Sequence, residues 1–127
     1  MILAHVLNAE ESESALRLPI SIQVHEKFVS TSALIDSGAD GQFIDSKFVA
    51  KHRIPCMKLS RPIPVLNVDG TSNVNGTITH YTWRSFTLGQ KRLTARLLIT
   101  SLGKEDVILG LPWLQKHNPN IDWKART

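Results

Sequence analysis

The chain has 127 residues, of which 42% are hydrophobic and 20% are charged, and this is the composition of an ordinary globular protein and not of a disordered one. The net charge is +4, but the basic residues are spread along the sequence, so nucleic-acid binding is not favoured as the main function. The single cysteine excludes an intrachain disulfide, and the five histidines are dispersed, so we expect no metal site and no cofactor.

The first 14 residues are expected to form an N-terminal extension, because a short apolar start is followed by a polar and acidic stretch. Residues 15–127 are then one domain. No apolar run approaches the roughly 20 residues of a membrane span, so we expect no membrane partner. Alternating or branched apolar residues predict extended segments in chain order over 16–24, 28–35, 62–68, 77–88, 92–99, 107–110 and 121–123.

Turn and cap signals divide these segments. Asp69-Gly70 and Asn75-Gly76 are two competing hairpin turns, and Gly89-Gln90 separates the strands of a long hairpin. Asp45 or Ser46 can cap a short helix through His52, and a second helix is predicted over 111–117. Many strands with little helix indicate a mostly β fold, a small closed or sandwiched barrel. The three tryptophans are expected to anchor the core or an interface, and they are Trp83, Trp113 and Trp123. The thiol of Cys56 is expected to be structural.

The most informative segment is Asp36-Ser37-Gly38-Ala39-Asp40, which follows the apolar run 33–35. It describes a carboxylate held at a tight turn, where Gly38 permits close approach and the Ser37 hydroxyl can bond nearby backbone. A lone Asp-Ser-Gly motif is weak evidence, because the same residues often simply end a strand.

The surrounding motifs resemble, in order, those of the retropepsin family, the aspartic proteases of retroviruses and retrotransposons. The similarity is greatest to the proteases of Gypsy-type long-terminal-repeat retrotransposons and their domesticated relatives. It covers about residues 16–123 and rests on ALIDSGAD at 33–40, FID at 43–45, VLNVDG at 65–70, VILG at 107–110 and HNPNIDW at 117–123. It implies a small closed β-barrel of the acid-protease fold, with one or two short helices and a flap hairpin over the active site.

The resemblance implies an aspartic endopeptidase that processes a polyprotein. Two carboxylates that share one proton can activate a water, and a chain with one such loop needs a second copy of itself to supply the second carboxylate. We therefore expect a homodimer with a peptide or polyprotein substrate, located in the cytoplasm or within intracellular virus-like particles. The catalytic candidates are Asp36, Ser37 and Gly38, and the substrate-binding candidates are Ala39, Asp40, Asn67, Val68, Asp69 and Gly70.

The sequence departs from the family at Leu111, where retroviral members often carry an Arg that pairs with the acid corresponding to Asp40. In retropepsins the chain ends commonly interleave across the dimer axis, and the candidates are Ile2–Leu7 and Ile121–Trp123, because neither has an obvious strand partner in its own subunit. Two alternative functions stay open: a catalytically silent retropepsin-like dimerisation or binding module, and a small basic nucleic-acid-binding β-barrel.

Overall fold

The computed structural model describes residues 4–5, 16–66, 72–110, 113 and 116, and only backbone is described at 4–5, 66 and 72–75. This part of the chain is mostly strand, with one short helix. The elements are β1 (Ala4–His5), β2 (Leu16–Val24), β3 (Lys27–Ile35), β4 (Phe43–Asp45), α1 (Ser46–Lys51), β5 (Met57–Leu66), β6 (Ser72–Leu88), β7 (Lys91–Thr100) and β8 (Val107–Leu109). None of the described helical residues belongs to a segment long and apolar enough to cross a bilayer.

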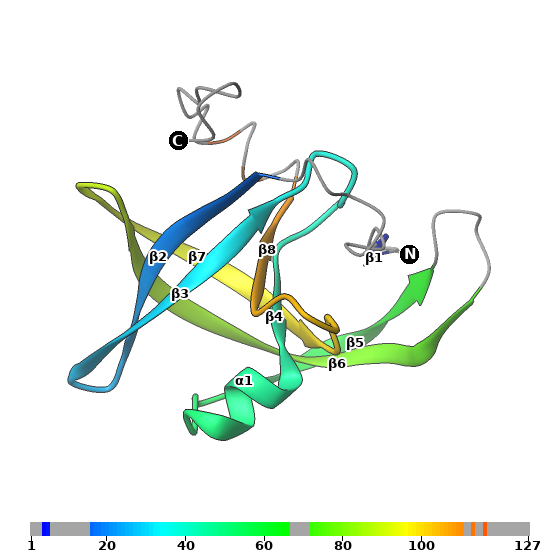
Figure 1. Cartoon of the computed structure of the whole chain (residues 1–127). Coiled ribbons are helices and arrows are strands. Elements are labelled where there is room, and N and C mark those ends of the chain that lie inside the picture. Colours follow the sequence, from blue (N-terminus) through cyan, green and yellow to red (C-terminus); the bar gives the residue numbers. More distant parts are fainter. Residues whose placement is uncertain (1–3, 6–15, 67–71, 111–112, 114–115, 117–127) are drawn as a thin grey trace.

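Six strands close into a barrel (Figure 1). Antiparallel pairs join β2 to β3, β2 to β6, β6 to β7 and β4 to β8. Parallel pairs join β3 to β8 and β4 to β7, and these complete the ring. The predicted mostly β fold with a closed barrel is therefore confirmed.

The β5–β6 hairpin extends away from the barrel, as Figure 1 shows. Its connection, and with it the predicted flap residues Asn67, Val68, Asp69 and Gly70, lies outside the described residues. The outer edge of β5 pairs in parallel with β1, where Ala4 lies opposite Val65 and His5 opposite Leu66. The expectation that the N-terminal segment lacks a strand partner in its own subunit is therefore wrong for these two residues, because the free edge of β5 supplies one.

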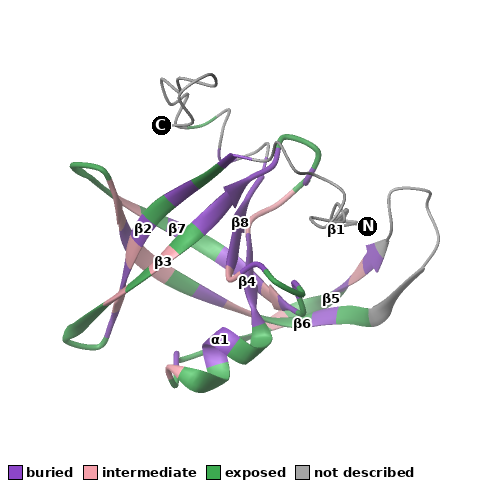
Figure 2. Ribbon diagram, viewed as in Figure 1, coloured by how far each residue is buried: buried purple, intermediate pink, exposed green. Residues whose placement is uncertain are grey.

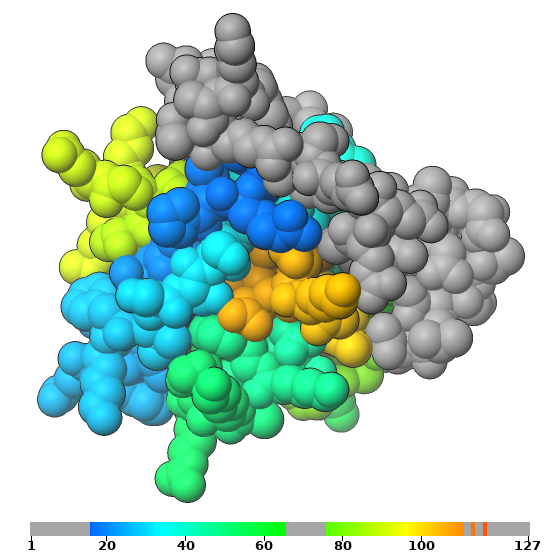
Figure 3. Space-filling view, in the orientation of Figure 1, coloured from blue at the N-terminus to red at the C-terminus, as the bar shows by residue number. Residues whose placement is uncertain are grey.

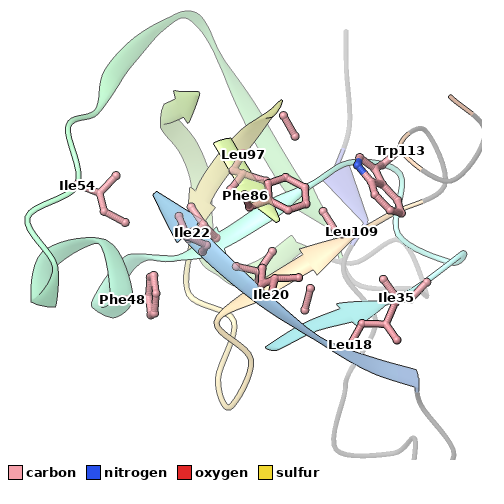
Figure 4. Packing of buried hydrophobic residues seen from close by; sticks show 14 of the residues in the cluster. Leu18, Ile20, Ile22, Ile35, Phe48, Ile54, Phe86, Leu97, Leu109 and Trp113 are labelled. Carbon is pink, nitrogen blue, oxygen red and sulfur yellow. The ribbon is translucent and has the colours of Figure 1, made fainter. Parts of the chain in front are cut away.

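The main core fills the barrel (Figures 2 and 4). Strict alternation along β2 sends Leu18, Ile20 and Ile22 inward, as the period-two pattern predicted. Trp113 also packs into this core and is 3% exposed. Trp83, in contrast, is 50% exposed, so it does not anchor the core, and its alternative role at an interface stays a prediction. Trp123 lies outside the described residues.

A second apolar cluster lies on the other face of the barrel wall. Residues 33–35, at the end of β3, and residues 107–109, which form β8, are buried throughout, so both segments pack on both faces. The second cluster consists of Leu34, Ala39, Phe43, Ile63, Val65, Ile78, Leu98, Leu102 and Ile108. It therefore connects the barrel wall to the stem of the β5–β6 hairpin.

Two local predictions fail in the hairpin. β5 begins at Met57 and not at Pro62, and Asn75-Gly76 lies within β6 and not at a turn. Gly76 has a φ of +74° where the pairing of β5 with β6 shifts register between Pro64 and Leu66, so a backbone irregularity absorbs the glycine inside the strand. The helix prediction is confirmed for α1, with Asp45 as its N-cap. Of the second predicted helix only Trp113 and Lys116 are described, and both are helical. The predicted terminal strand 121–123 lies outside the described residues.

Candidate active site

Asp36 follows directly after β3, at the point where two parallel strands end together. Ile35 is paired with Leu109 of β8, and the N–H of Asp36 extends this ladder by donating to the Leu109 carbonyl oxygen at 3.0 Å. The carbonyl oxygen of Asp36 accepts from the Ala39 N–H at 3.1 Å, which closes a tight turn. The predicted catalytic loop is therefore held by β8 at its first residue.

Asp36 is 8% exposed, and the two oxygens of its carboxyl group have different surroundings. Oδ1 accepts from the Gly38 N–H at 2.9 Å, so the predicted catalytic glycine contributes a backbone donor. Oδ2 is buried and has no hydrogen-bond partner within the described part of the chain. A buried oxygen without a hydrogen bond destabilises the fold unless another group donates to it. Oδ2 is therefore the leading candidate for a functional contact.

Burial raises the pKa of the Asp36 carboxyl above its ordinary value, because desolvation penalises the charged form. The backbone N–H groups of Gly38 and Ala39 act in the opposite direction and do not cancel the effect of burial. A carboxyl group whose pKa is raised can hold a proton closer to neutrality, which is what a general acid or a shared-proton pair requires.

The other predicted residues of the loop lie beside Asp36 but differ in their exposure to solvent. Ser37 and Gly38 are exposed beside the Asp36 carboxyl group. Ala39 is buried in the second apolar cluster, and Asp40 is exposed on the same loop. Leu111, the position of the family's arginine, lies outside the described residues.

Gly110 is a further residue of the site that was absent from the predicted list. A Cβ atom added to it would lie 2.2 Å from the carbonyl oxygen of Gly41 and 2.6 Å from that of Ala39. Only glycine permits this approach of the chain after β8 to the catalytic loop. The sequence signal was the glycine after the apolar run 107–109, but nothing in the sequence says which backbone it meets.

Gln42 was missed as well, and it fixes the far end of the loop. Its Oε1 accepts from the Trp113 N–H at 3.1 Å, and its backbone oxygen accepts from the Leu98 N–H at 2.9 Å. The loop is therefore held by β8 at Asp36, by the Gly110 contact in the middle, and by β7 and Trp113 at Gln42. This arrangement gives the Asp36 carboxyl a defined direction.

Three carboxyl side chains, two of them buried, hold the connection between β7 and β8. Asp45 Oδ1 accepts from the Leu102 N–H at 2.9 Å while its Oδ2 caps α1. Glu105 is 7% exposed and pairs with Arg17 Nε at 2.7 Å, and Thr31 Oγ1 donates to Asp106 at 2.5 Å. Figure 3 shows this segment, in orange, at the surface between β3 and α1. These contacts set the position of β8 and so support the site indirectly.

Other candidate chemistry is not assembled in this part of the chain. No three His, Cys, Asp or Glu residues gather among the described residues in a way that could hold a metal ion. Cys56 is exposed, and its thiol donates to the Ile54 carbonyl oxygen at 3.2 Å.

Comparison with known proteins agrees with this geometry. A family model described as the PEG10/RTL1 protease domain matches residues 32–127. The EIAV protease complexed with the inhibitor HBY-793 superposes with a TM-score of 0.60 at 16% identity, covering 86% of this chain and 93% of that one. The retroviral protease-like domain of Ddi1 from Leishmania major superposes with a TM-score of 0.56 at 18% identity, covering 87% and 81%. These two likenesses show that the barrel has the retropepsin fold.

Proposed function

Because the chain belongs to the PEG10/RTL1 protease domain family, we propose that it is an aspartic endopeptidase and that it works as a homodimer. The observation that carries the proposal is Asp36 Oδ2, a buried carboxylate oxygen without a partner in the described residues, on a group whose pKa burial raises. Each chain contributes one such loop, and two loops related by a twofold axis would bring two carboxyl groups together.

In the proposed mechanism the two Asp36 carboxyl groups share one proton. The ionised group takes a proton from a water, which attacks the scissile carbonyl carbon, while the protonated group donates a hydrogen bond to the carbonyl oxygen. The proton taken from the water then passes to the nitrogen of the scissile bond as the C–N bond breaks, which releases an amine and a carboxylic acid. Like charges this close cannot both be ionised, so the pair titrates as a unit.

Ser37, Gly38 and Asp40 are proposed to brace the paired loops and to hold the substrate backbone. The substrate is an extended peptide, lying between the loops and the β5–β6 hairpin and pairing with it in the manner of an added strand. A segment of a polyprotein in extended conformation has this form, and we propose it as the substrate class.

A peptide-cleavage assay tests the proposal. Purified protein is incubated with a mixed peptide library from pH 4 to pH 7, with and without pepstatin, beside the Asp36→Asn variant. We expect cleavage with a bell-shaped pH profile centred on the acid side of neutrality, inhibition by pepstatin, and no cleavage by the variant. Cleavage by Asp36→Asn near the wild-type rate would refute the assignment. A dimer that binds peptides and cuts none would identify the silent module instead.

A further inference from the structure

The three strands β5, β6 and β7 contain no acidic residue. All 11 Asp and Glu residues of the chain lie elsewhere, although these strands make up much of the barrel and of the hairpin stem. Six basic residues lie on them: Lys58, Arg61, Arg84, Lys91, Arg92 and Arg96. Cations that are spread along the sequence are therefore collected on one sheet by the pairing of β5 with β6 and of β6 with β7.

Strand alternation sorts the side chains of this sheet. Thr82, Phe86, Ala95 and Leu97 are buried toward the barrel, so their neighbours project outward. The cross-strand pairs on the outer side of the barrel wall are Tyr81 with Met57 and with Leu98, which the second apolar cluster buries, Trp83 with Arg96, Ser85 with Thr94, and Thr87 with Arg92. We call the outward residues Met57, Tyr81, Trp83, Arg92 and Arg96 the aromatic–arginine face.

Side-chain contacts hold several members of this face in place. The Arg96 guanidinium lies 5.6 Å from the centre of the Tyr81 ring, and the Tyr81 hydroxyl contacts Met57 Sδ at 3.8 Å. Arg92 is hydrogen-bonded to Gln23 Oε1. Met57 is nevertheless 46% exposed and Trp83 50% exposed, so the face presents large side chains to solvent in a fixed arrangement. Such preorganisation lowers the entropic cost of binding.

Beside Trp83 the surface is hollowed. A cavity of about 310 Å³ is lined by Trp83 and Arg84 together with Gln23, His25, Pro55 and Ser85, none of them acidic. Arg84 Nη1 donates to the Gln23 carbonyl oxygen at 3.4 Å, which places its guanidinium within this hollow.

Buried packing links one end of the face to the catalytic loop. Tyr81 packs against the second apolar cluster, which also contains Ala39 of the catalytic loop and Ile63 of the hairpin stem. The hollow beside Trp83 is lined by His25, at the turn before β3, whereas Asp36 follows the opposite end of β3, so the face lies along the barrel wall away from the Asp36 loop.

We propose that the aromatic–arginine face is an exosite that binds an acidic segment of the polypeptide substrate, outside the residues that flank the scissile bond; this inference rests on the proposed function. Guanidinium groups pair bidentately with carboxylates, and β5, β6 and β7 contain no acidic residue that would repel an acidic ligand. Trp, Tyr, Met and Arg are also the residues enriched where proteins bind polypeptides, whereas the acidic residues that are depleted there are absent from these strands.

Binding is measured on the full-length Asp36→Asn protein, so that no peptide is consumed. The probes are a fluorescent dodecapeptide of alternating Glu and Ser, the same peptide with Gln in place of Glu, and a fluorescent oligothymidylate. We expect the Glu peptide to bind at least about tenfold tighter than the Gln peptide, which corresponds to about 1.4 kcal/mol. Arg96→Glu should remove this preference, Arg96→Gln should reduce it, and Trp83→Ala should weaken binding of the Glu peptide.

Lys47→Glu is the matched control. It lowers the net charge of +4 by two units, as Arg96→Glu does, but it lies exposed in the first turn of α1, where a negative charge is favourable. Equal loss of binding in Lys47→Glu and Arg96→Glu, equal affinity for the Glu and Gln peptides, or tighter binding of oligothymidylate than of the Glu peptide would each overturn the exosite.

The catalytic link is tested on the wild-type protein with a peptide that it cleaves. Adding the Glu-rich flank should lower KM with kcat unchanged, and Arg96→Glu should cancel the gain. An unchanged KM would refute the exosite while leaving the protease assignment intact. Binding of the Glu peptide by a protein that cleaves nothing would refute the proposed protease and leave an acidic-peptide docking face.

Discussion

Gly110→Ala tests whether close packing behind the catalytic loop positions Asp36. The added Cβ would start 2.2 Å from the Gly41 carbonyl oxygen, and such contacts are essentially never closer than 3.0 Å, so the two backbones must separate by about 0.8 Å. Neither partner is a flexible side chain that could turn away. Overpacking of this kind costs about 1–3 kcal/mol, and a displacement near 1 Å at a reacting group can cost about 100-fold in rate.

The assay is thermal melting together with peptide cleavage, both at one protein concentration because the stability of a dimer depends on it. Gly110→Ala should lower Tm by several degrees and kcat by about 100-fold. Gly41→Ala is the control, because Gly41 supplies the other side of the contact with Gly110. Its Cβ would lie 3.2 Å from the Phe43 ring and would not approach backbone, so a smaller loss of Tm and kcat is expected. A Gly110→Ala protein with wild-type Tm and kcat would refute the positioning role.

Three further predictions concern the ionisation of Asp36, the ion pair of Arg17 with Glu105, and the dimer. Burial raises the pKa of Asp36, so ionisation of this group lowers the free energy of unfolding of the wild type. Asp36→Asn should therefore have the higher Tm in calorimetry near neutrality. This advantage should disappear below pH 3.8, the ordinary pKa of the carboxyl group. An equal difference in Tm from pH 3 to pH 7 would contradict this. Arg17→Met leaves Glu105 buried without its cation and should lower the free energy of unfolding in urea by about 1–2 kcal/mol. This figure is kept small because the Arg17 side chain is 39% exposed, and solvent screens the pair. An unchanged urea midpoint would show that the pair contributes nothing. Specific activity should fall on dilution in step with the dimer fraction from sedimentation, and a fully active monomer would refute the shared carboxyl pair.

Local patterns predicted the parts of the fold that depend on local chemistry. The alternation in residues 16–24 gave β2 its correct bounds, and Asp45 caps α1 because its side chain can reach the N–H groups of Lys47 and Phe48. The Asn75-Gly76 turn failed for the opposite reason. Strand pairing outweighs the turn preference of these two residues, because β6 pairs with β5 at one end and with β7 and β2 at the other.

Contacts between distant segments could not be predicted in the same way. The sequence shows a glycine at 110 and a glutamine at 42, but which backbone each one meets depends on the parallel pairing of β3 with β8 and of β4 with β7. The exposure of Trp83 has the same origin, because the face of β6 that turns outward is set by the partners of the strand. Charge segregation onto β5, β6 and β7 likewise becomes visible only when the strands lie side by side.

The buried oxygen of Asp36 favours the catalytic interpretation of the Asp-Ser-Gly loop over that of a turn that only ends a strand. A turn that only ended a strand would be more stable with its carboxylate in water, since burial without a partner is unfavourable. Here the loop is instead held in place by Leu109, Gly110 and Gln42, and Oδ2 is kept out of water without a bond in the described residues. Buried polar atoms without a partner are expected chiefly at functional sites, and a second carboxyl group across a twofold axis would supply the partner by sharing a proton. We therefore expect dimerisation to complete the hydrogen bonding of Asp36 in the same step that assembles the catalytic pair.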